Sequence, residues 1–161
     1  MTVLGLSPYT WFHVFLSLAM LVAGFVVTKD LLRSRVDPIV MATFLVTGVL
    51  TSATGFGFPF QRFIESHYVG LISLIILAAA IVGLYVFRLA GPWRWIFALG
   101  VVLAFYFDAL VAIAQLFRKV PALGAPTATN ELPFVISQIA LLAVFIWLCV
   151  SVVKRFRPAS A

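Results

Sequence analysis

Charged residues are scarce in this sequence. Only 10% of its 161 residues are Asp, Glu, Lys or Arg, whereas 64% are hydrophobic. A water-soluble domain is nearer one quarter charged and one half apolar, and the core of a chain this short is too small to hide the excess. The composition therefore excludes an ordinary water-soluble domain and predicts a chain that is solvated by lipid.

Motifs for chemistry are also missing. The single cysteine, Cys149, excludes an intrachain disulfide, and without a CxxC pair or a Cys/His cluster no metal site is expected. The sequence contains no GxSxG elbow, HExxH helix or glycine-rich phosphate loop, so no catalytic residue is assigned and an enzyme is not favoured. The net charge of +6 lies in short loops rather than in a basic stripe interleaved with aromatic residues, which argues against nucleic acid as a partner.

Long apolar runs are what the sequence does have. A helix needs about 20 mostly apolar residues to cross the hydrocarbon core of a bilayer, and runs without strict alternation do not fit the strands of a barrel. The first ten residues contain no Lys or Arg, so the first run is interpreted as a retained helix and not as a cleaved signal peptide. We predict one all-α domain over residues 1–161, a bundle of five transmembrane helices at residues 11–27, 39–58, 68–87, 95–117 and 134–153.

Lys and Arg residues predict the orientation of this bundle. Five spans divide the connections between two sides of the membrane, and cytoplasmic loops carry an excess of Lys and Arg. One side has eight such residues and the other has three, so the side with eight is predicted to be cytoplasmic, with the N-terminus outside and the C-terminus inside. The eight are Lys29, Arg33, Arg35, Arg88, Arg94, Lys154, Arg155 and Arg157, and the three are Arg62, Arg118 and Lys119.

Asp108 is the only acidic residue inside a predicted span. A carboxylate at the centre of a membrane helix costs about 2.5–3.5 kcal/mol on insertion scales, so it normally faces the bundle interior or water. Asp108 continues a four-residue repeat of small residues that begins at Gly100 and Ala104, and Gln115 lies on the same face. Intramembrane carboxyls are often functional, but a structural, protonated Asp108 bonded to a neighbouring helix is an equal alternative.

Polar residues of several spans fall at a similar depth, in the predicted outer half of the membrane. We infer from this a polar pocket that opens to the outer face, with Asp108 as its charged group and His13 as the partner of Asp108. His67 is at the outer end of the third span, where a solvated histidine is common. The threonines of the second span are expected mainly to bond to backbone carbonyls and to pack closely. The predicted pocket residues are Asp108, His13, Gln115, Ser17, Thr51, Gln138 and His67.

Three functions are compatible with these residues. The first is binding or transport of a small ligand or ion in the pocket, in a transporter, sensor or accessory subunit. The second is electron transfer through a b-type haem, because His13 and His67 on two helices would be the axial ligands of one iron. The third is a structural or assembly subunit, a homo-oligomer or a part of a larger membrane complex, whose lipid-facing surfaces dock partners.

Five stretches of the chain carry a resemblance. Residues 11–27 (WFHVFLSLAMLVAGFVV), 50–60 (LTSATGFGFPF), 67–74 (HYVGLISL), 87–97 (FRLAGPWRWIF) and 119–123 (KVPAL) together resemble a group of small uncharacterised multi-span proteins of bacterial inner membranes. The resemblance runs over most of the chain. It implies a bacterial inner membrane and a compact helical bundle, but no activity and no catalytic residue.

Overall fold

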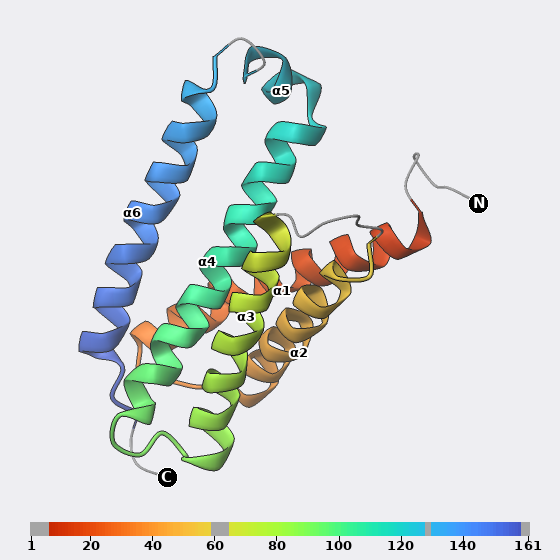
Figure 1. Ribbon diagram of the computed structural model, residues 1–161. Coiled ribbons are helices and arrows are strands. Elements are labelled where there is room, and N and C mark those ends of the chain that lie inside the picture. The colour runs from red at the N-terminus through yellow and green to blue at the C-terminus, as the bar shows by residue number, and fades with distance from the viewer. Residues whose placement is uncertain (1–6, 59–64, 128–129, 159–161) are drawn as a thin grey trace.

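Helices make up nearly all of the described chain. The computed structural model describes residues 7–58, 65–127 and 130–158, and these ranges contain no strand. Figure 1 shows long helices joined by short turns. The helices in chain order are α1 (Pro8–Leu32), α2 (Pro38–Gly55), α3 (Glu65–Ile81), the π-helical turn η1 (Val82–Val86), α4 (Trp93–Lys119), α5 (Pro121–Thr127) and α6 (Leu132–Arg155).

Five of these helical segments are long and apolar enough to cross a membrane, which confirms the predicted all-α bundle. They are α1, α2, α4, α6 and the continuous segment of α3 and η1 between His67 and Val86. Each contains nearly all of one predicted span, although α2 ends at Gly55, three residues before the predicted end. Helix starts follow the local chemistry: the Ser7 hydroxyl and the Asp37 carboxylate accept the first free backbone N–H groups of α1 and α2. A proline, whose missing N–H costs nothing in the first turn, follows each of these caps.

The helices form a four-sided bundle with one helix outside it. α1, α2, α3 and α4 pack in that order, α4 packs back on α1, and α6 lies against α4 and α1. Close approach depends on small residues. A Cβ atom on Gly24 of α1 would lie 2.5 Å from the Phe105 ring of α4, and one on Gly100 of α4 would lie 3.3 Å from Ala80 of α3. α4 contacts the most elements of the described chain: α1, α3, η1, α5 and α6.

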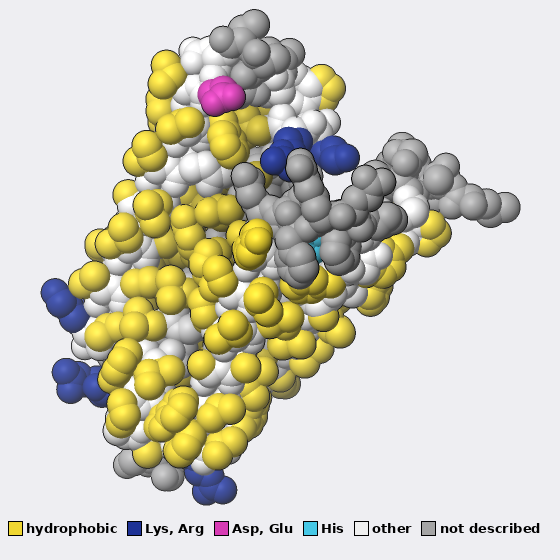
Figure 2. All heavy atoms as spheres, viewed as in Figure 1, with side chains coloured by type: hydrophobic (Ala, Val, Ile, Leu, Met, Phe, Trp, Pro, Cys, Tyr) yellow, Lys and Arg dark blue, Asp and Glu magenta, His cyan; other side chains and the backbone are white. Residues whose placement is uncertain are grey.

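Lys and Arg residues are distributed unequally between the two ends of the bundle. The end at which α1, η1 and α6 finish and α2 and α4 begin is called here the basic end, and the opposite end the far end. Figure 2 shows dark blue groups at both ends and a broad yellow surface between them. Arg118 and Lys119 lie at the far end, and Arg62 lies outside the described residues. The basic end carries Lys29, Arg33, Arg35, Arg88, Arg94, Lys154, Arg155 and Arg157.

The packed core lies toward the basic end. On α1 the buried residues begin at Leu16, and on α4 they end at Ala109. Beyond these points the N-terminal part of α1 diverges from the upper parts of α4 and α6 (Figure 1). The connection between α4 and α6 contains the short helix α5, which packs on α4 and α6. The far half of the bundle is thus more loosely packed than the basic half.

The end of α6 and the residues after it form hydrogen bonds with the loop between α1 and α2. The Ser34 hydroxyl donates to the Arg155 carbonyl at 2.7 Å and accepts from the Arg157 backbone N–H at 2.9 Å. Phe156 lies between Arg155 and Arg157 in the sequence and is 1% exposed. Its ring contacts the Phe97 ring of α4 at a centroid distance of 5.9 Å. This contact packs the C-terminal end of α6 against α4 at the basic end, where α6 otherwise buries few side chains.

Replacing Phe156 with Ala is expected to release the end of α6, because truncation of a buried phenylalanine costs about 3–5 kcal/mol in well-packed cores. The apparent unfolding temperature in mild detergent should fall, and trypsin should cleave after Lys154 more rapidly. Arg157→Ala is the control, since Arg157 bonds through its backbone and its side chain is exposed. Equal behaviour of the two variants would contradict the role given to Phe156.

Candidate functional site

Asp108 lies at the contact between α4 and α1. The Ser17 hydroxyl of α1 donates to Asp108 Oδ1 at 2.7 Å. Asp108 is only 9% exposed, and its second oxygen, Oδ2, is buried without a hydrogen-bond partner among the described residues. One oxygen of the carboxyl group is therefore hydrogen-bonded, and the other has no partner among the described residues.

The close approach of α1 and α4 explains why a side chain as short as serine reaches Asp108. α1 runs from the far end to the basic end and α4 runs back, so the two helices are antiparallel. Gly24 faces the Phe105 ring, and nearer the far end, about two turns along α1 and one turn along α4, Ser17 meets Asp108. The absence of a side chain at Gly24 sets the helix separation that this hydrogen bond requires.

His13 lies one turn before Ser17 and bonds to α2. Its Nδ1 atom is 2.8 Å from the Thr54 hydroxyl, whose single proton is donated to the Leu50 carbonyl at 2.7 Å. With this proton on the Leu50 carbonyl, His13 bonds to the hydroxyl when its ring carries a proton on Nδ1. The predicted pair of Asp108 with His13 is wrong as a direct contact: Asp108 bonds to Ser17, and His13 bonds to Thr54.

Two further predicted residues carry buried oxygen atoms without partners among the described residues. Thr51 lies on α2, one turn before Thr54, and its Oγ1 atom is unpaired. Gln138 lies on α6; its amide nitrogen donates to the Leu110 carbonyl of α4 at 3.4 Å, and its Oε1 atom is unpaired. Among the described residues, buried polar atoms without partners thus occur on four helices: those of Thr51, Asp108 and Gln138 lie near the far limit of the packed core, and Thr28 Oγ1 lies on α1 toward the basic end.

The last two predicted residues lie elsewhere. Gln115 is exposed near the end of α4. His67 is not a solvated cap: it is 4% exposed, and its ring lies 5.5 Å from the ring of Phe56, just after α2. Their positions place both residues outside the contact between Ser17 and Asp108.

The two histidines contact different residues near the end of α2. His13 and His67 both rest against the end of α2, at Thr54 and Phe56, which are two residues apart and so point to different sides of the chain. His13 also commits Nδ1 to Thr54 and places its ring edge-on against Phe58, at a centroid distance of 5.1 Å.

Two residues of this region were not among the predicted site residues. Thr54 is the partner of His13, and the Tyr9 hydroxyl donates to the Thr54 carbonyl. The available signal was the row of threonines in α2. Of these, Thr43 and Thr47 bond to carbonyls of their own helix, as expected, whereas Thr54 also joins α1.

Comparisons with known proteins add no family to this description. No protein-family model, curated protein or solved structure matches the chain. The class of protein that the fold defines is a multi-pass helical membrane protein. Within this class, the residues around Asp108 are the features of the chain that bear on its function.

Proposed function

We propose that this chain binds a small, singly charged cation or a proton at Asp108 and carries it, or senses it, in a bacterial inner membrane. One observation supports this above all: a buried carboxyl group has one oxygen fixed by Ser17 and the other without a partner. The side chain is held in place, yet its second oxygen is left for a group that the chain does not supply.

The unpaired oxygen of Asp108 carries a cost in free energy. A buried polar atom without a hydrogen bond costs about 1–3 kcal/mol. An ionised Asp108 leaves lone pairs of Oδ2 unfilled, and a neutral acid with its proton on that oxygen leaves an O–H group without an acceptor. A bound proton together with water, an alkali cation or a protonated amine removes this cost. A single carboxylate matches a single positive charge, and no three His, Cys, Asp or Glu side chains of the described ranges are grouped for a multivalent metal.

The position of Asp108 favours entry from the far end. It is followed on α4 by Ala109, the last buried residue of that helix, and Ser17 follows Leu16, the first buried residue of α1. The path from Asp108 to the far end therefore crosses the loosely packed half of the bundle. The excess of Lys and Arg at the basic end favours a cytoplasmic location for that end, so the site would open to the outside, with the N-terminus on the same side.

Cations are expected to raise the apparent unfolding temperature of the purified protein, because a ligand that binds only the folded state stabilises it by mass action. The measurement compares sodium, potassium, methylammonium and choline chlorides at equal ionic strength in mild detergent. A second arm follows a pH gradient across vesicles that contain the protein. If no salt shifts the unfolding temperature relative to choline, and the vesicles hold their gradient as well as empty ones, the proposal is wrong.

The second candidate function is an assembly subunit. Among the described residues of α6 only Phe145 and Val152 are buried, so most of its apolar surface is presented outward. A partner helix would find its largest uncovered surface there. Co-purification of a partner that is lost when Ile139, at 61% exposure, is replaced by Lys would favour this candidate over cation binding.

A further inference from the structure

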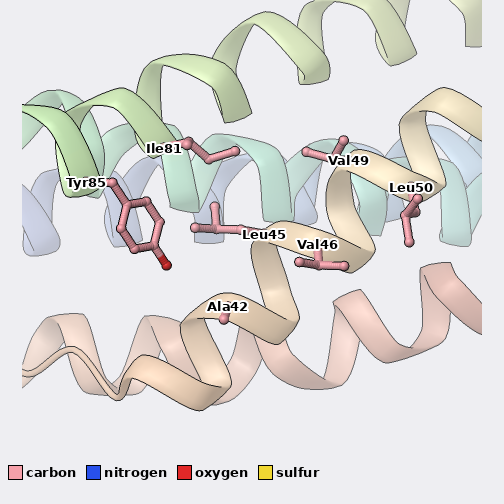
Figure 3. A pocket seen from close by; sticks show the side chains of 7 residues that line it. All are labelled: Ala42, Leu45, Val46, Val49, Leu50, Ile81 and Tyr85. Atoms are coloured by element: carbon pink, nitrogen blue, oxygen red, sulfur yellow. The ribbon is translucent and has the colours of Figure 1, made fainter.

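A second site lies on the outer surface of the bundle, away from Asp108. It is an apolar groove of about 290 Å³ between α2 and the segment formed by α3 and η1 (Figure 3). Five lining residues belong to α2, and the other two are Ile81 and Tyr85. The full set is Ala42, Leu45, Val46, Val49, Leu50, Ile81 and Tyr85. The only polar side-chain atom in this set is the Tyr85 hydroxyl oxygen.

The local backbone builds the groove. The α2 residues recur at intervals of three and four, so they form one continuous stripe along the helix. On the other wall, the bond from the Phe87 N–H to the Val82 carbonyl makes η1 one residue wider than an α-helical turn. Tyr85 lies on this widened turn, and Figure 3 shows its ring projecting toward α2. Tyr85 is 58% exposed and Val46 56% exposed, so the groove opens to the membrane and not to the core.

Two arginines lie in the chain segments that adjoin the groove residues nearest the basic end. Tyr85 is followed within one turn by Arg88, and Ala42 is preceded by the loop that contains Arg35; both arginines are exposed at the basic end. The one acidic residue in that loop, Asp37, already accepts the Ile39 and Val40 backbone N–H groups. An apolar groove whose two walls are continued in the chain by exposed segments that carry Arg35 and Arg88 matches an acyl chain joined to a phosphate.

We propose that this groove is a binding site for an anionic phospholipid, with one acyl chain along α2 and the phosphate at Arg35 and Arg88. The surface lies in the hydrocarbon region, where acyl chains are the available apolar ligands. This site is independent of cation binding at Asp108, and either proposal can fail without the other.

The test is native mass spectrometry of the full chain in mild detergent, titrated with phosphatidylglycerol and phosphatidylethanolamine that carry the same acyl chains. The unaltered protein is expected to retain one phosphatidylglycerol in preference to phosphatidylethanolamine. Val46→Trp, which fills the groove, should weaken this binding at least about tenfold. Val22→Trp is the matched control, because Val22 is 68% exposed on α1 and lies outside the groove.

The charge is tested separately. Arg35→Gln combined with Arg88→Gln should abolish the preference for phosphatidylglycerol while the binding of either lipid persists weakly. Inorganic phosphate should not compete, since it lacks the acyl chain. The proposal is overturned if Val46→Trp binds phosphatidylglycerol as Val22→Trp does, if the double Gln variant keeps its preference, or if Val46→Trp instead changes the oligomeric state, which would assign the groove to a second copy of the chain.

Discussion

Replacing Asp108 with Asn should weaken cation binding by about 10- to 100-fold while the protein still inserts and folds, because a hydrogen bond to a charged group contributes about 1.5–3 kcal/mol. The asparagine amide has the same shape as the carboxyl group. Its oxygen can accept from Ser17, as Asp108 Oδ1 does at 2.7 Å, so the contact between α1 and α4 survives. The negative charge and the free oxygen are lost, and an NH2 group takes the place of Oδ2.

Two measurements separate binding from folding. The rise in unfolding temperature with sodium, potassium or methylammonium should disappear in Asp108→Asn, and the unfolding temperature in choline should stay close to that of the unaltered protein. Ser17→Ala is the converse variant: it keeps the charge but removes the donor to Asp108, so it should lower stability and retain a cation effect. A full cation effect in Asp108→Asn would assign Asp108 a structural role, the alternative that the sequence left open.

The spans could be predicted from the sequence because lipid imposes a length and a composition on every crossing helix. The predicted helix from 134 to 153 falls inside α6, with Pro133 in its first turn. The π-helical turn η1 could not be predicted, since the residues from Val82 to Val86 are as apolar as the α-helical residues before them. The short helix α5 was not predicted because Pro121 and Gly124 are typical of turns and loops.

The sequence named candidate residues for a site but did not predict which of them bond to one another. Asp108 and Ser17 were both singled out, yet the partner assigned to Asp108 was His13, one helical turn from the residue that bonds to it. Two quantities determine which side chains of neighbouring helices meet: the rotation of each helix about its axis and the offset of one helix relative to the other along that axis. Apolar residues surround α1 on all sides, so the pattern does not fix its rotation. The offset follows from the contact of Gly24 with Phe105, which no local signal reveals.

Replacing Gly24 with Ala is expected to destabilise the protein by about 1–3 kcal/mol, the usual cost of overpacking. The added Cβ atom would lie 2.5 Å from the Phe105 ring. That ring cannot turn aside, because it is 2% exposed and is held edge-on between Phe25 and Phe145, at centroid distances of 5.0 and 5.1 Å. α1 must therefore move away from α4, and the hydrogen bond between Ser17 and Asp108 must lengthen with it. The apparent unfolding temperature and the cation effect should fall together.

A double-mutant cycle shows whether the loss comes from this one contact. Phe105→Leu removes the ring atoms that the new methyl group would strike, so the double variant should be more stable than the sum of the two single changes predicts. The double variant should also regain part of the cation effect, because α1 can approach α4 again. Val22→Ala is the control, since Val22 faces outward on the same helix. Strict additivity of Gly24→Ala and Phe105→Leu would mean that the spacing of α1 and α4 is set elsewhere, and the geometry at Asp108 would then need another cause.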